Sequence, residues 1–110
     1  MRLIALIAAL FFLQAQALAQ DTGNVMLRDC KAAVDQKPDA GAAYCLGYVA
    51  AIGQVRNFLS EKEKFCPSTQ VTTMQMTRVV VQFMERNPSV LDKPFLLLAL
   101  FAYEEAWPCK

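Results

Sequence analysis

The sequence contains no histidine, and this absence bears on both catalysis and metal binding. Histidine is the commonest general base, so catalytic triads of the usual kind cannot be assembled. The four cysteines lie 15, 21 and 43 residues apart, so they include neither a C-x-x-C redox pair nor a closely spaced zinc pair. Glu104 and Glu105 are adjacent and point in different directions on a helix. We therefore predict a protein that is not an enzyme and needs no cofactor or metal.

The sequence also lacks an apolar run that is long enough to span a membrane. The strongly apolar stretch Leu3–Leu13 has 11 residues, whereas a spanning helix needs about 20. It follows a basic start at Arg2 and precedes the small-residue site 17–19, which is the layout of a secretory signal. We expect residues 1–19 to be a cleaved signal peptide and residues 20–110 to form one soluble domain.

Neither sign of charge is in excess in the exported part. Without Arg2, 10 basic residues face 10 acidic ones. Binding to nucleic acid depends on a basic surface. We therefore expect no nucleic-acid partner.

Four helical segments are predicted, each with apolar residues at helical spacing and each ending at a polar or proline-marked break. They are Asn24–Gln36 with Asn24 as the cap, Ala40–Leu59, a third that begins near Thr69 or Thr72 and stops at Asn87, and a fourth from after Asp92 to Trp107. Helices joined by short breaks pack as antiparallel neighbours. The sequence thus predicts an all-α, disulfide-stapled bundle of about four helices with up-down topology.

All four cysteines lie in the exported part, and an even number in a small exported chain predicts disulfides. In an up-down bundle, Cys30, about two turns before the end of the first helix, lies at a height similar to that of Cys45, just over one turn into the second. Cys66 precedes the third helix and Cys109 follows the fourth, and those two ends also lie together. Of the three possible pairings, we predict Cys30 with Cys45 and Cys66 with Cys109.

Two segments are more apolar than a small bundle requires. Residues 40–53 and 95–103 carry no charge, although a helix of a monomeric bundle needs only one apolar stripe. The surplus is explained either by deep burial in the core or by a protein interface, and the second explanation favours a homodimer. Charged residues on both sides of 95–103 argue against insertion into a membrane.

Several short motifs follow one another along the exported part. They are Cys45-Leu46-Gly47-Tyr48-Val49 with Gly53, Cys66-Pro67 with Val71, Thr72 and Gln75, Val79-Val80-Val81 leading to Asn87-Pro88, and Ala106-Trp107-Pro108-Cys109. With these motifs the chain resembles the Rap/Tai immunity proteins, small periplasmic proteins that neutralise peptidoglycan amidase effectors of type VI secretion systems. The resemblance implies an all-helical domain, a homodimer, periplasmic localisation and inhibition by blocking the cleft of the effector.

Blocking a cleft requires a rigid projection, because a preorganised surface loses less entropy on binding. The best candidate is the turn formed by Arg86, Asn87, Pro88 and Ser89, between the third and fourth helices. The alternative for this turn is an ordinary connection between helices. The alternative for the whole protein is a general periplasmic binding or chaperone-like module, which would use the apolar surplus to hold unfolded clients.

Overall fold

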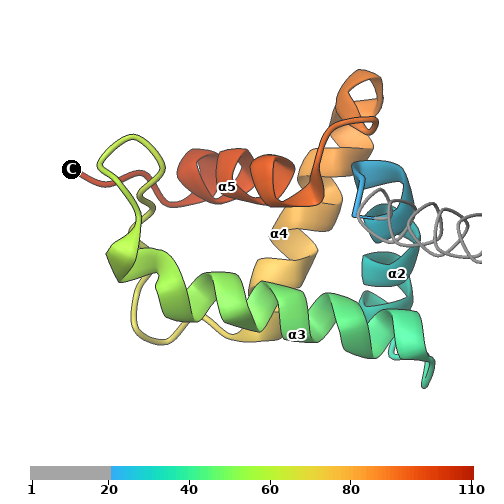
Figure 1. Cartoon of the computed structure of the whole chain (residues 1–110). Helices are drawn as coiled ribbons and strands as arrows, with labels where there is room; N and C mark the ends of the chain where they lie inside the picture. The colour runs from blue at the N-terminus through green and yellow to red at the C-terminus, as the bar shows by residue number, and fades with distance from the viewer. Residues whose placement is uncertain (1–20) are drawn as a thin grey trace, which may run out of the picture.

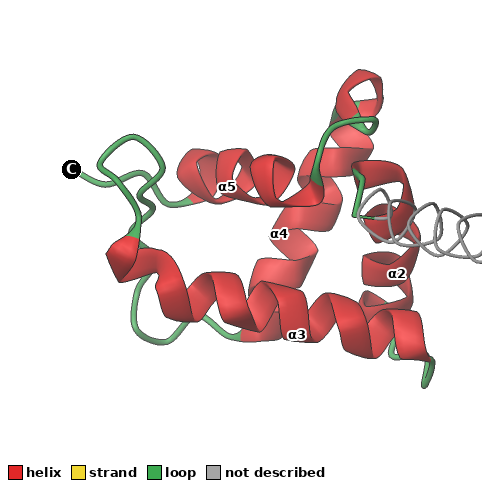
Figure 2. Ribbon diagram, viewed as in Figure 1, coloured by secondary structure: helices red, strands yellow, loops and turns green. Residues whose placement is uncertain are grey.

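The structure is a computed structural model that describes residues 21–110 and is helical throughout its regular parts (Figure 1). The helices are α2 (Gly23–Val34), α3 (Ala40–Val55), α4 (Thr73–Arg86) and α5 (Phe95–Ala106), with short 3-10 turns η1 (Arg56–Phe58) after α3 and η2 (Pro88–Val90) after α4. Figure 2 shows loops between these helices and no strand in residues 21–110. The predicted all-α class is confirmed. The predicted signal peptide, residues 1–19, lies outside the described residues.

The helices form a small splayed bundle around one apolar core. In Figure 1, α3 and α5 run across the view one below the other, and α2 and α4 run crosswise to them. α2 packs against α3 and α4, and α4 packs against α5. The largest fully buried side chains are those of Met26, Val49, Phe65, Val80, Met84, Phe95, Leu98 and Tyr103.

The start of α2 differs from the prediction. Its N-cap residue is Thr22, whose side chain makes no capping hydrogen bond. The backbone N–H of Gly23 donates to the carbonyl of Lys93 at 3.0 Å, and that of Asn24 donates to the carbonyl of Leu91 at 2.8 Å. A distant segment therefore satisfies N–H groups that a helix start leaves free. The prediction that Asn24 caps this helix is wrong because the α4–α5 connection replaces a capping side chain.

The close approach at the start of α2 depends on the missing side chain of Gly23. A Cβ atom there would lie 2.9 Å from the carbonyl oxygen of Leu91 and 2.5 Å from Cδ1 of Leu98. Contacts this short would force the two segments apart. Gly23 thus allows the first turn of α2 to lie directly on the connection that precedes α5.

The start of α4 agrees with one of the two predicted positions. Thr72 is the N-cap, and its Oγ1 accepts a hydrogen bond of 3.1 Å from the backbone N–H of Gln75. Helix α4 ends at Arg86, because the residue before a proline is driven out of the helical region and Pro88 follows Asn87.

Both disulfides have the predicted pairing. Cys30 is joined to Cys45 and Cys66 to Cys109, with Cα–Cα distances of 5.2 and 5.0 Å. The first pair is completely buried between α2 and α3. The second pair is exposed and links the segment before α4 to the residues after α5.

The apolar surplus of α5 is divided between the core and the surface. Six residues of the helix are buried: Phe95, Leu98, Ala99, Leu100, Ala102 and Tyr103. Leu96, Leu97 and Phe101 remain 41–49% exposed. Within residues 21–110, no helix combines the length and the apolar character needed to cross a membrane.

Candidate functional site

The turn formed by Arg86, Asn87, Pro88 and Ser89 lies on the surface, at the end of α4. Arg86, Pro88 and Ser89 are exposed, and Asn87 is half-buried. Figure 1 shows the end of α4 and the turn after it extending beyond the rest of the bundle at the top of the view. The structure therefore places the predicted turn, residues 86–89, on a projecting part of the molecule.

Local hydrogen bonds hold this turn in one conformation. The side-chain amide of Asn87 donates to the carbonyl of Phe83 at 2.8 Å, and its backbone N–H donates to the carbonyl of Met84 at 3.2 Å. Both carbonyls belong to the last turn of α4, and no later N–H group of the helix is available to donate to them. Pro88 then begins η2 with a restricted backbone angle. The turn is thus short, bonded to its helix and preorganised.

Arg86 also connects the turn to α5. Its Nη2 donates to Oε1 of Glu105 at 2.8 Å, and its Nε donates to the carbonyl of Gln82 at 3.4 Å. Both members of the ion pair remain more than half exposed, so the pair contributes little to stability. In the structure it directs the arginine side chain toward α5. A carboxylate from a binding partner would have to share the guanidinium with Glu105 or displace it.

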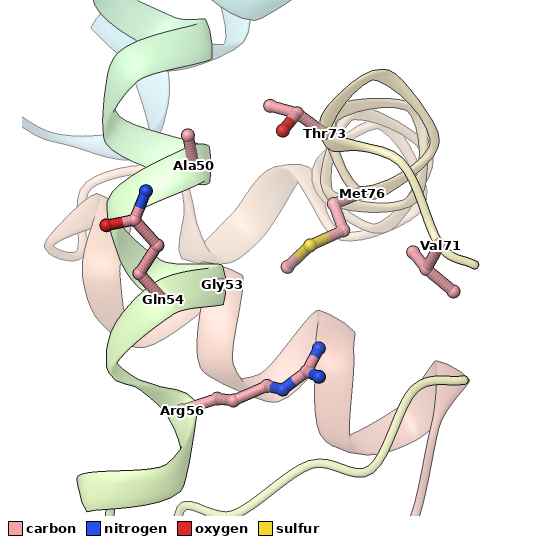
Figure 3. A pocket seen from close by; sticks show the side chains of 7 residues that line it. All are labelled: Ala50, Gly53, Gln54, Arg56, Val71, Thr73 and Met76. Carbon is pink, nitrogen blue, oxygen red and sulfur yellow. The ribbon is translucent and has the colours of Figure 1, made fainter. Parts of the chain in front are cut away.

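Sequence reasoning did not connect Glu105 with Arg86. Glu105 lies 19 residues after Arg86, and no helical or strand periodicity connects positions so far apart. A second feature that it missed is a cavity of about 240 Å³ between the C-terminal half of α3 and the start of α4. Figure 3 shows the seven lining residues, which include Arg56, Gln54 and Met76.

The tyrosines with raised pKa values lie outside the candidate turn. The hydroxyl of Tyr44 donates to the carboxylate of Asp21 at 2.9 Å, and this bond raises the pKa of Tyr44 above its ordinary value. Burial raises the pKa of Tyr48 and of Tyr103. Perturbed pKa values are frequent at catalytic sites. Here they belong to one tyrosine that contacts the start of the described chain and to two that pack against aromatic neighbours.

No group of three or more His, Cys, Asp and Glu side chains is placed to hold a metal ion anywhere in residues 21–110. The geometry of the site is that of a small disulfide-linked helical domain with a braced, projecting turn.

A comparison with known protein families assigns this helical domain to one of them. The model of the Rap1a immunity proteins matches residues 22–109, nearly all of the described chain. The protein belongs to the Rap1a immunity protein family, in agreement with the resemblance found in the sequence. No curated protein and no solved structure gives a significant match. Family membership places the chain among proteins that confer immunity by binding a toxin effector.

Proposed function

We propose that this protein is a periplasmic immunity protein that binds and occludes a peptidoglycan amidase effector of a type VI secretion system. The observation that carries the proposal is the family match over residues 22–109. The secretory pattern of residues 1–19 supports export. The two disulfides support an oxidising compartment such as the periplasm, since cytosolic thiols are kept reduced.

In this proposal the turn at residues 86–89 enters the cleft of the amidase and excludes its peptide substrate. The hydrogen bonds of Asn87 and the ion pair of Arg86 with Glu105 keep the turn in shape before binding. Little conformational entropy is then lost when the complex forms. Inhibition requires no catalytic group from this chain, because steric exclusion is sufficient.

The direct test coexpresses this protein with peptidoglycan amidase effectors of type VI secretion systems, each directed to the periplasm. We expect the wild-type chain to prevent lysis and the Arg86→Ala variant to bind at least about tenfold more weakly, equivalent to about 1.4 kcal/mol. Calorimetry with the purified proteins measures the affinity. Absence of binding by the wild-type chain to any amidase would refute the proposed function.

Two control variants separate the roles of Arg86. Arg78→Ala removes an exposed arginine from the same helix and should leave the affinity unchanged. Glu105→Gln breaks the ion pair but leaves Arg86 in place. Weaker binding by Glu105→Gln as well as Arg86→Ala would show that the ion pair between Arg86 and Glu105 is needed for binding, and not only the arginine itself. Full protection by the Arg86→Ala/Asn87→Ala double variant would place the interface elsewhere.

We also propose that the protein is a homodimer. The exposed residues Leu96, Leu97 and Phe101 on α5 support a second copy as the partner, since patches of this kind on soluble proteins mark interfaces. Light scattering at micromolar concentration should give twice the monomer mass, and Phe101→Glu should give the monomer. Phe58→Glu changes another exposed phenylalanine, on η1, and should leave the dimer intact. A wild-type monomer at all concentrations would refute this proposal.

The same exposed apolar residues favour one alternative function, a chaperone-like module that holds unfolded clients. Such a module would suppress the aggregation of an unrelated reduced protein. An immunity protein would not do so at equimolar ratio. Light scattering of a heat-denatured client, with and without the protein, distinguishes the two functions.

A further inference from the structure

The cavity between α3 and α4 is lined by polar and apolar groups together. Its volume is about 240 Å³, below the roughly 300–1,000 Å³ that is typical of pockets for drug-sized ligands. The lining residues are Ala50, Gly53, Gln54, Arg56, Val71, Thr73 and Met76. A cavity of this size and lining suits one short side chain or a small organic molecule.

Arg56 is the only charged residue that lines the cavity. Figure 3 shows its guanidinium directed into the space beside the thioether of Met76. The side chain is half-buried, and within residues 21–110 it forms no ion pair and donates no hydrogen bond. Arg28 and Arg86, in contrast, are both paired with carboxylates. A partly desolvated cation without a partner inside a cavity is suited to an anionic ligand.

The shape of the cavity depends on Gly53. A Cβ atom at this position would meet Sδ of Met76 at 3.4 Å and its Cε at 3.7 Å, so a side chain longer than alanine would reach into the space. Ala50, one helical turn earlier, also contributes only a methyl group. These two small residues leave room beside Arg56 for an apolar chain of a few carbon atoms.

We propose that this cavity binds a carboxylate that is carried on a short aliphatic chain. The guanidinium of Arg56 pairs with the carboxylate, because its planar fork of N–H groups matches the two oxygens. Thr73 supplies a further polar contact at the rim, and the aliphatic chain lies against Ala50, Gly53 and Met76. Two sources have this chemistry: a free short-chain acid and a glutamate side chain of a bound protein. The proposal stands whether or not the protein inhibits an amidase.

The test is an NMR titration of the protein purified from the periplasm after expression of the full chain. Butyrate is the free-acid probe, and the blocked tripeptide acetyl-Ala-Glu-Ala-amide is the side-chain probe. We expect saturable shifts of the Arg56 Nε–Hε and Met76 methyl signals, with a midpoint in the millimolar range. Butyramide and the matching glutamine peptide have the same shape without the charge and should bind at least about tenfold more weakly.

Saturation by butyrate alone would assign the cavity to free acids, and saturation by the tripeptide would assign it to a protein side chain. Either result supports the proposal. Equal shifts with butyramide, or shifts that grow linearly with concentration for both charged probes, would overturn it.

Three variants locate the binding. Arg56→Gln should weaken butyrate binding at least about tenfold, and Ala50→Leu should do the same by filling the cavity while the charge stays in place. Arg78→Gln removes an exposed arginine of α4 that does not line the cavity and should have no effect. Unchanged binding by Arg56→Gln, with the helical spectrum retained, would overturn the proposal. Ala50→Leu distinguishes binding in the cavity from simple attraction of an anion to a positive surface.

Discussion

The two disulfides of this domain have contrasting surroundings. Cys30 and Cys45 join two helices and have no exposed surface. Cys66 and Cys109 join two irregular segments and are both exposed. The sequence separations are 15 and 43 residues, for which loop closure alone gives about 3 and about 4 kcal/mol of stabilisation. Loop closure therefore predicts a larger stabilisation by the exposed disulfide, whereas core packing adds stabilisation only at the buried one.

The exposed disulfide lies beside an aromatic cluster. Phe65, next to Cys66, is buried and its ring centroid lies 5.1 Å from that of Tyr103. Trp107 packs on the same tyrosine at 5.9 Å, and its carbonyl accepts a 2.8 Å hydrogen bond from the N–H of Cys66. The exposed bond thus holds an irregular segment, and the core residue that it carries, against α5. The buried bond is itself a part of the core.

Removal of the buried disulfide should have the largest effect on stability. We expect Cys30→Ala/Cys45→Ala to lower the free energy of unfolding by about 5 kcal/mol. About 3 kcal/mol of this loss comes from loop closure, and about 2 kcal/mol comes from the space left by two core sulfur atoms. Small domains have only about 5–15 kcal/mol in total. Urea denaturation followed by circular dichroism measures the change.

The matched variant is Cys66→Ala/Cys109→Ala. It should lower the free energy of unfolding by about 4 kcal/mol, all of it through loop closure. Both cysteine residues are exposed, so their replacement by alanine leaves no buried cavity. A larger loss for this variant than for Cys30→Ala/Cys45→Ala would show that loop length outweighs core packing. The exposed disulfide would then be the more stabilising of the two.

Reduction should separate the two bonds kinetically. A thiol reductant attacks a sulfur atom directly, so its rate depends on access to that sulfur. We expect Cys66–Cys109 to be reduced at least about tenfold faster than Cys30–Cys45 under native conditions. Timed alkylation followed by peptide mass spectrometry identifies the thiols that appear first. Simultaneous appearance of all four would mean that global unfolding precedes both reductions.

Sequence reasoning succeeded where the structure depends on local pattern. The helix breaks at Pro38, Asn87 and Pro108 are local signals, and the four predicted helices follow from apolar spacing. The disulfide pairing was predicted from the up-down order of helices that these breaks imply, which sets Cys30 level with Cys45 and brings Cys66 beside Cys109. The break at Asn87 and Pro88 also predicted that residues 86–89 connect two helices.

Sequence reasoning failed where distant segments meet. The N–H of Asn24 is satisfied by the carbonyl of Leu91, and Arg86 pairs with Glu105. The cavity around Arg56 exists only because the start of α4 lies beside the end of α3. None of these contacts has a periodicity that a single sequence displays, since each depends on how the helices are packed.

Alkaline pH should destabilise the region of the exposed disulfide through Tyr103. Burial raises the pKa of this tyrosine in the folded state above its ordinary value of 10.0. Above pH 10 the unfolded chain loses this proton while the folded chain keeps it, so stability falls as pH rises, by up to about 1.4 kcal/mol per pH unit. Urea midpoints measured from pH 8 to 11 test this. The Tyr103→Phe variant should show a shallower decline, and equal slopes would contradict the assignment to Tyr103.

The smallest effect is expected for Tyr103→Phe at neutral pH, and its sign is informative. The hydroxyl of Tyr103 is buried and has no hydrogen-bond partner in residues 21–110, so folding removes it from water without compensation. Deleting it should raise the free energy of unfolding by about 1 kcal/mol, whereas Tyr48→Phe, at a half-buried tyrosine, should change it by less than about 0.5 kcal/mol. Urea denaturation at pH 7 measures both. If Tyr103→Phe is destabilising instead, the hydroxyl contributes to the aromatic cluster under Cys66–Cys109, and that end of the molecule is as closely optimised as the helix pair around Cys30–Cys45.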